Sequence, residues 1–445
     1  MKVVALVVLT LAFLWANVEA YPSPNAMSNI LLAYRFVTEG SARISGFEDV
    51  PLSNWERTDG YPQYNRFAPG TAVVLSPAVA VAVVAGAEPR DIGVWAYLDK
   101  AVATALVVLA ALATFAATRR LTGDGAALVA TFAVVAGTSL ATIASQRTWQ
   151  HPVAVAAVAI AWLWIVRGQQ DGRWLARAGL PLALAITVRY PLAVIWLAFL
   201  AYLLWRHRTS VLAYLGWSAG PLVFLAIYTT VVFGSPVSNS YGPQLWQWAS
   251  LIGLPGNLIS PSRGLFVFSP FLVAGVWSIA RRALRGEPLW VFALASLLGM
   301  LLVHGLYIGW WGGWTYGNRY FLEVMPILAT GVAFAWGGAG GWRRYVLAAA
   351  IVFAVVIQVA GLLAYYHFWN GVNWDDARVQ VDDNDAARQM WDVVDPQWWW
   401  TIRAAIATVD VRAAILMPIT LVFGYIAFRA GAARPNVAGV GSRAA

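Results

Sequence analysis

The sequence contains no cysteine among its 445 residues. That absence excludes disulfide bonds, thiolate metal sites and cysteine nucleophiles, and it leaves the redox compartment undetermined. Charge is also scarce, because only 11% of the residues are charged while 60% are hydrophobic. This composition is typical of a polytopic membrane protein and excludes a soluble domain with a large core.

Sequence signatures of soluble enzymes are missing as well. We find no phosphate-binding loop of the Gly-x-x-x-x-Gly-Lys type, no dinucleotide fingerprint and no His-Glu-x-x-His. Four histidines and no cysteine make a dedicated zinc site unexpected, so we assign no cofactor and leave a divalent metal requirement open. The net charge of +9 comes from short basic clusters between apolar runs, which indicates membrane orientation rather than nucleic-acid binding.

The apolar runs predict an all-α polytopic membrane protein with about twelve transmembrane helices in a single domain, residues 1–429. Every second loop is basic, so these loops, both termini and the tail 430–445 should be cytoplasmic. An outside N-terminus with the first loop inside is the alternative, and residues 3–18 could instead be a cleaved signal peptide. The expected spans are 3–18, 96–117, 125–144, 152–166, 176–188, 191–205, 211–233, 265–280, 289–308, 320–336, 345–366 and 412–429.

The first external loop, residues 21–95, should carry surface helices. A helix over Asn25–Glu39, ended by Gly40, shows one apolar and one polar face. Residues 70–87 are moderately apolar and contain Pro77, and we expect them to form a re-entrant or interfacial helix that does not cross the membrane. The apolar face should hold Met27, Ile30, Tyr34 and Val37, and the polar face Asn25, Ser28, Asn29, Arg35 and Glu39.

The stretch Gly309–Pro326 lies between two apolar runs and should form a short turn at the edge of the bilayer. Its three tryptophans and two tyrosines suit a membrane interface, and its glycines allow tight folding among the rings. Arg319 adds an always-charged, forked donor that matches a phosphate. The alternative is an aromatic belt with an arginine that reaches to the interface.

Two expected spans, on either side of Arg189-Tyr190-Pro191, are short. They offer about 20 Å each, against about 30 Å of hydrocarbon. Arg189 should therefore lie below the outer surface in a cavity, because a buried cation is unfavourable unless it is solvated or paired. The alternative is one Pro-kinked helix whose arginine pairs with a carboxylate elsewhere.

The outward loops collect the remaining polar residues, including His151, Arg189, Arg263 and Arg319, beside a short external domain over 366–411. Several cations on one non-cytoplasmic face indicate a site for an anionic head group. His151, at a helix start, is either a substrate contact or a histidine hydrogen-bonded at the interface.

The order of these motifs resembles the GT-C class of polytopic glycosyltransferases, especially bacterial and archaeal proteins similar to protein O-mannosyltransferases (glycosyltransferase family 39). The resemblance covers nearly the whole chain, and its specificity comes from the order of the motifs. They are Glu39-Gly40, Arg66-Phe67-Ala68-Pro69-Gly70, Trp149-Gln150-His151, Thr187-Val188-Arg189-Tyr190-Pro191, Ser262-Arg263-Gly264 with Ser269-Pro270, Trp310 to Tyr320, and Trp391-Asp392 with Asp395-Pro396-Gln397.

The resemblance implies a multi-pass protein of the plasma membrane that transfers a sugar, of hexosyl or mannosyl type, from a polyprenyl-phosphate donor. The acceptor would be a glycan, lipid or protein on the non-cytoplasmic face, and the transfer usually inverts configuration. Cations would stabilise the departing phosphate. Arg319 fits that role best, with Arg189, Arg263, Tyr320 and His151 as further substrate contacts.

One residue departs from the family pattern, which usually has an aspartate where this chain has Asn25. An amide cannot accept a proton as a carboxylate does. We therefore take Asn25 and Asp59 as the candidate catalytic positions, with Glu48, Asp49 and Glu56 as other acids of the same loop. The competing functions are a catalytically inactive lipid-phosphate-binding descendant, and a transporter or flippase of a lipid-linked anion, which should show a repeat that we do not see.

Overall fold

The computed structural model describes residues 23–47, 67–237, 251–313, 315–364 and 390–407, with isolated positions before residue 66 (7, 10, 11, 13–15, 50, 64 and 65). Within the described residues the elements are helices, and there is one isolated β-bridge, between Arg43 and Tyr64. The all-α fold class is therefore confirmed. The helices long and apolar enough to cross a membrane are Ile92–Thr122, His151–Gly168, Arg208–Phe233, Pro288–Gly305 and Trp342–Ala364.

Among the described residues, four shorter apolar helices accompany these five, so the count of about twelve spans stays a prediction. The expected span 412–429, most of 3–18, most of the external domain 366–411 and the tail 430–445 lie outside the described residues.

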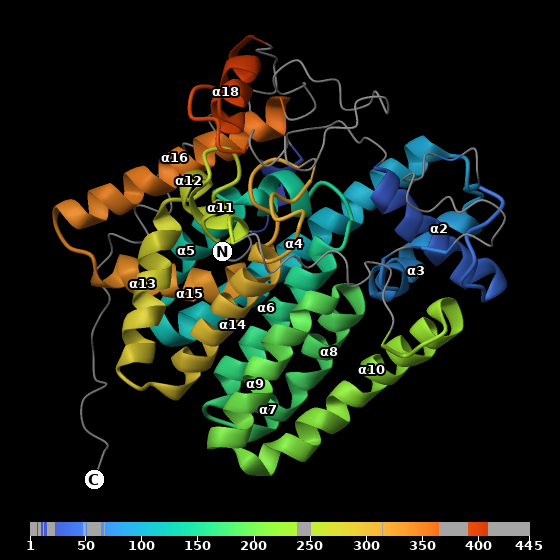
Figure 1. The fold of residues 1–445 in the computed structure, drawn as a ribbon, viewed down its shortest axis with the longest axis horizontal. Coiled ribbons are helices and arrows are strands. Elements are labelled where there is room, and N and C mark those ends of the chain that lie inside the picture. Colours follow the sequence, from blue (N-terminus) through green and yellow to red (C-terminus); the bar gives the residue numbers. More distant parts are fainter. Residues whose placement is uncertain are drawn as a thin grey trace.

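A central bundle forms the core of the molecule (Figure 1). Helix α4 packs against α5, α6 and α15, and α15 packs in turn against α13. Alanine and valine dominate the facing surfaces, so the helices approach closely. The bounds are α4 Ile92–Thr122, α5 Asp124–Ala136, the π-helix η2 Leu140–Ala144, α6 His151–Gly168, α13 Phe271–Leu284, α14 Pro288–Gly305 and α15 Met325–Gly338.

The chain around Arg189 forms a helical hairpin. Helix α8 (Gly179–Val188) leads to the turn η3 (Tyr190–Leu192), and α9 (Ala193–Arg206) returns beside it. The two helices are antiparallel, because α7 (Gly172–Arg177) before α8 contacts η4 (Arg208–Ser210) after α9. Two separate short helices are thus confirmed, and the alternative of a single kinked helix is wrong.

The first loop places two helices beside the bundle. Helix α2 (Pro24–Glu39) packs against α3 (Gly70–Val84), and Gly40 ends α2 with a φ of 63°. Both helices match their expected positions. Helix α10 (Val211–Phe233) runs from η4 to this pair and places Tyr228 in the same apolar cluster (Figure 1).

The expected division of α2 into an apolar and a polar face is wrong in part. Ser28 and Asn29 are fully buried, whereas Val37 is exposed. The reason is that α2 is enclosed on two sides: α3 covers one, and the loop before α6 meets Asn29 on the other.

An irregular segment between α14 and α15 lies at one end of the bundle, and the long helix α16 runs along the bundle against α5 and α13 (Figure 1). Helix α18 packs on α16, and α11 packs on α14. Among the described residues of this irregular segment, the only helical turn is η6, which directly precedes α15. The bounds are α11 Gly253–Ile259, α12 Leu265–Phe268, η6 Leu322–Val324, α16 Trp342–Ala364 and α18 Gln397–Ala407.

Candidate functional site

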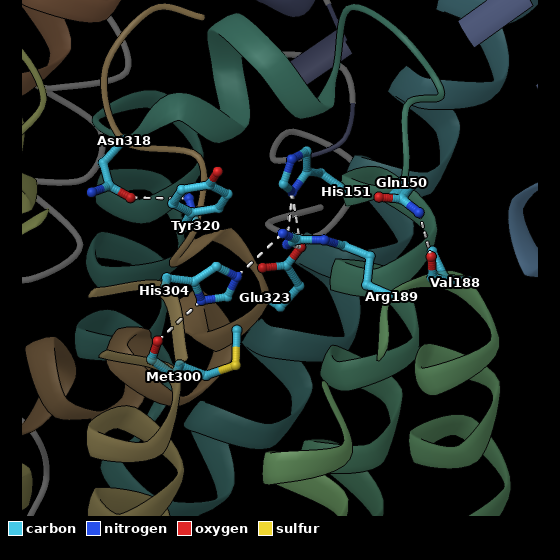
Figure 2. Close-up of polar contacts among 9 residues, drawn as sticks. All are labelled: Gln150, His151, Val188, Arg189, Met300, His304, Asn318, Tyr320 and Glu323. Carbon is cyan, nitrogen blue, oxygen red and sulfur yellow. Dashed lines mark hydrogen bonds and ion pairs between the residues drawn. The ribbon is translucent and has the colours of Figure 1, made fainter. Parts of the chain in front are cut away.

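Four helix ends bring four ionisable side chains together (Figure 2). His151 is the first residue of α6, Arg189 follows α8, His304 is the residue before the last of α14, and Glu323 lies in η6. All four are buried, and Glu323 is 0% exposed. We call these residues the ionic cluster.

Glu323 is the centre of the ionic cluster. Its Oε1 accepts a hydrogen bond from Arg189 Nη1 at 2.5 Å and lies 2.8 Å from His151 Nδ1. Arg189 Nη2 lies 3.3 Å from His304 Nε2. A buried cation is strongly unfavourable unless it is paired, so Glu323 is what allows Arg189 to be here. The expectation that Arg189 opens on a cavity is wrong, because its guanidinium is packed among these partners. Its pairing with a carboxylate elsewhere in the chain, which was part of the alternative, is confirmed.

The partners of the two histidines fix their tautomers. His304 Nδ1 lies 3.0 Å from the Met300 carbonyl oxygen, which can only accept, so Nδ1 carries the proton and Nε2 accepts from Arg189. His151 Nδ1 is 2.8 Å from the Glu323 carboxylate and 3.3 Å from Arg189. The shorter contact to an ionised acceptor makes Nδ1 a donor, which leaves a lone pair on His151 Nε2.

A second cation, Arg319, lies beside the ionic cluster. The Tyr320 ring stacks on His304 with centroids 4.4 Å apart. Arg189 Cζ and Arg319 Cζ lie 5.9 Å and 5.4 Å from that same ring, and Arg319 Cζ lies 5.6 Å from the Trp149 ring. In the part of the chain that the structure describes, no carboxylate pairs with Arg319. Arg319 is thus the cation of this site that can meet an external anion.

The described rings of the Gly309–Pro326 stretch are buried in the protein, so the alternative of an aromatic belt is wrong, while the position of this turn at the edge of the bilayer stays a prediction. Tyr316 donates to the Ile357 carbonyl oxygen at 3.0 Å, and Trp310 fills the space above Gly253 and Gly256. The expected tight glycine turns are confirmed, with positive φ angles at Gly312, Gly313 and Gly317. The buried rings of the stretch are Trp310, Trp311, Tyr316 and Tyr320; Trp314 lies outside the described residues.

Arg263 is not part of the ionic cluster. It is buried, and it donates to the Gln397 side-chain oxygen and to the Gly313 carbonyl oxygen, the latter at 3.2 Å. Gln397 also binds the backbone of Thr315 and Gly317. These contacts fix the glycine-rich turn against the start of α18. A direct contact between Arg263 and a phosphate stays a prediction.

The start of α2 reaches the same site. Trp149 donates from its indole nitrogen to Ser23 Oγ at 2.7 Å, and Asn29 donates to the Thr148 carbonyl oxygen at 3.3 Å. Asn25 is half-buried in the first turn of α2 and stands two residues after Ser23, the residue that accepts the hydrogen bond from Trp149. The other catalytic candidate, Asp59, lies outside the described residues, as do Glu48, Asp49 and Glu56.

Asp99, a buried residue of α4, fixes the loop before α6. Its Oδ1 accepts from the Thr148 amide at 2.7 Å and from the Thr148 hydroxyl. Asp99 thereby sets the position of Trp149 and, beyond it, of His151. Among the described residues, no group of three or more histidine or acidic side chains could hold a metal ion.

The sequence interpretation did not select Glu323, His304 or Asp99. All three stand inside apolar stretches, and an ionisable residue in such a stretch is a functional candidate by itself. That signal identifies the residues one by one. It does not reveal that Glu323 meets Arg189, because 134 positions separate them.

The helical arrangement is that of the GT-C fold, as the sequence resemblance predicted. No protein-family model and no curated protein matches the chain. The fold is similar to that of ArnT from Cupriavidus metallidurans in the apo state, with 14% sequence identity, a TM-score of 0.55, and coverage of 96% of this chain and 76% of that chain. For ArnT bound to undecaprenyl phosphate the TM-score is 0.52 at 13% identity, covering 96% and 75%.

An Archaeoglobus fulgidus oligosaccharyltransferase, solved in complex with Zn and sulfate, is also similar. Its TM-score is 0.50 at 16% identity, with 89% of this chain and 58% of that chain covered. These neighbours are glycosyltransferases of the GT-C fold. At such low identity the likeness establishes the fold of this chain.

Proposed function

We propose that the protein is a membrane glycosyltransferase that moves a sugar from a polyprenyl-phosphate donor to an acceptor on the non-cytoplasmic face. The observation that carries the proposal is Arg319, a cation without a carboxylate partner among the described residues, whose Cζ lies 5.6 Å from the Trp149 ring and 5.4 Å from the Tyr320 ring. One neighbour of the same fold was solved bound to undecaprenyl phosphate, a ligand of the proposed class.

Arg319 has the chemistry needed by a leaving phosphate. Its planar guanidinium offers two parallel donors to phosphate oxygens, and its charge offsets the negative charge that develops when the bond to the sugar breaks. The Trp149 and Tyr320 rings restrict the guanidinium to one region, so little reorganisation is needed during the reaction. Arg189, whose Cζ lies 5.9 Å from the Tyr320 ring, adds positive charge nearby while it stays paired with Glu323.

The distribution of basic residues supports the non-cytoplasmic face. The ionic cluster lies at the start of α6 and at the ends of α8 and α14. The opposite ends of these helices, or the turns attached to them, carry basic side chains: Arg167, Arg173, Arg177, Arg281, Arg282 and Arg285. Basic loops stay on the cytoplasmic side, so the site belongs on the other side.

The test is sugar transfer or release by the purified protein in lipid nanodiscs, with a panel of polyprenyl-phosphate monosaccharides, hexoses included. We expect turnover with one donor, and a loss of about 100-fold or more in Arg319→Ala. Arg343→Ala removes an exposed arginine at the start of α16 and should keep the wild-type rate. The configuration of the product reports whether transfer inverts the anomeric centre.

Two results would contradict the proposal. If no lipid phosphate binds, a transporter of another lipid-linked anion becomes the better interpretation. If wild type binds a donor without turnover, while Asn25→Asp gains activity, the chain is an inactive descendant of such an enzyme.

A further inference from the structure

We propose that His151, oriented by Glu323, is the base that takes the proton from the acceptor hydroxyl. This inference rests on the proposed function and names the class of acceptor, a hydroxyl group. It would supply the proton acceptor that the amide of Asn25 cannot provide.

The geometry of the pair matches that of a base and the group that orients it. Glu323 Oε1 lies 2.8 Å from His151 Nδ1, and this hydrogen bond fixes both the ring orientation and the tautomer. Among the described residues nothing hydrogen-bonds to His151 Nε2, whose lone pair lies on the other edge of the ring (Figure 2). A hydroxyl that reaches Nε2 would find an acceptor.

Glu323 is itself held so that it can support a charged imidazole. Arg189 pairs with Oε1, and His304 accepts from Arg189, so this row of side chains has one consistent set of donors and acceptors. The second carboxylate oxygen, Oε2, is buried and has no hydrogen-bond partner within the described part of the chain. The Glu323 carboxylate, although paired with Arg189, lies directly against Nδ1, and this charged hydrogen bond favours a proton taken up by His151.

The base and the phosphate site are adjacent. Trp149, two residues before His151, lies against Arg319, and Arg319 shares the Tyr320 ring with Arg189. A sugar whose phosphate meets Arg319 would therefore have its anomeric carbon near His151. The acceptor could approach that carbon from the side of the histidine.

The step balances as follows. The acceptor O–H proton moves to His151 Nε2 while the hydroxyl oxygen forms a bond to the anomeric carbon. The bond from that carbon to the phosphate oxygen breaks, and its electron pair leaves with the polyprenyl phosphate, next to Arg319. The imidazolium then releases its proton to water.

The experiment separates donor binding from turnover. In His151→Asn the amide nitrogen takes the place of Nδ1, so the hydrogen bond to Glu323 can persist while the Nε2 lone pair is lost. We expect kcat to fall about 100-fold or more, with donor binding in nanodiscs unchanged. His207→Asn, in the turn between α9 and η4, is the matched control and should keep the wild-type rate.

A pH profile distinguishes a base from a merely structural histidine. Around His151 the charged and titratable groups are Glu323, Arg189, Arg319 and, behind Arg189, His304 with Tyr320. Wild type should show a rise of kcat with pH that His151→Asn lacks. Glu323→Gln, which keeps an acceptor oxygen but removes the charge, should lower kcat at least about tenfold with unchanged donor binding.

The inference is overturned if His151→Asn turns over at the wild-type rate, or if its pH profile keeps the rising limb. Should His151→Asn not purify as a folded protein, Glu323→Gln decides the matter, and a wild-type rate in that variant overturns the inference. Turnover that depends on Arg319 but not on His151 would leave the proposed function standing without this base. Failure of wild type to turn over any donor would remove both.

Discussion

Glu323 is the side chain on which the arrangement of the ionic cluster depends. It is fully buried, and its carboxylate is what pairs with Arg189 in the interior. Removing one member of such a pair leaves an uncompensated buried charge, which is far more unfavourable than the loss of a surface contact. The sequence predicts the need for a partner, and the fold supplies Glu323 from a distant segment.

Glu323→Ala should therefore lower the free energy of unfolding by about 3–5 kcal/mol, because Arg189 would remain buried without a counter-charge. Thermal unfolding in nanodiscs measures this. Glu287→Ala breaks the partly exposed pair with Arg282 and should change stability by less than about 1 kcal/mol.

A double variant completes the comparison. Arg189→Met with Glu323→Ala removes both charges and should be more stable than Glu323→Ala alone. If Glu323→Ala were as stable as Glu287→Ala, the result would contradict the structural importance of the buried pair.

Close helix contacts hold the bundle that carries the site. Helices α13 and α15 touch through glycine, since a methyl group added at Gly331 would lie 2.3 Å from the Gly275 carbonyl oxygen. Small residues allow this approach, and the gain is close packing over the whole contact. The spacing matters for the site because α15 directly follows η6, which holds Glu323.

Gly331→Ala should push α13 away from α15 and reduce stability by about 1–3 kcal/mol, the usual range for an overpacked interior. Gly337→Ala, in the same helix, meets nothing within 4 Å and should be neutral or slightly stabilising. Thermal unfolding of both variants provides the comparison. A neutral Gly331→Ala would mean that the two helices separate easily.

The whole molecule has two ends of different character. The site, with α2 and α3 beside it, lies at one end, and the turn η4 with its flanking arginines lies at the other (Figure 1). Helix α10 joins them, because it begins at η4 and packs near its end against the α2 and α3 pair. Labels on the two ends should therefore report opposite sides of the membrane.

The absence of cysteine makes that orientation directly testable. An impermeant maleimide added to intact cells should label Ser41→Cys, after the end of α2, and should label Thr209→Cys, in η4, only after permeabilisation. The wild-type chain is an unlabelled control. The reverse pattern would place the site on the cytoplasmic side and contradict the proposed face.

The sequence by itself determined the helical membrane fold, because long apolar runs in a bilayer must satisfy their backbone hydrogen bonds internally. It also determined the end of α2 at Gly40 and the two short helices around Arg189, which depend on local backbone preferences and on length. Such features need no knowledge of distant contacts. The faces of α2 and the environment of the Gly309–Pro326 rings were mispredicted, because both depend on contacts with segments that are distant in the sequence.

Only the tertiary structure decided which charges meet. Arg189 finds Glu323, Trp149 lies against Arg319, and Arg263 turns to Gln397, each across a large separation in sequence. The sequence shows where each charge and each aromatic ring stands in the chain. The partner of a buried charge depends on which helix ends come together when the helices pack. Burial then makes that pairing strong, because an interior ion pair has no water to replace its partner.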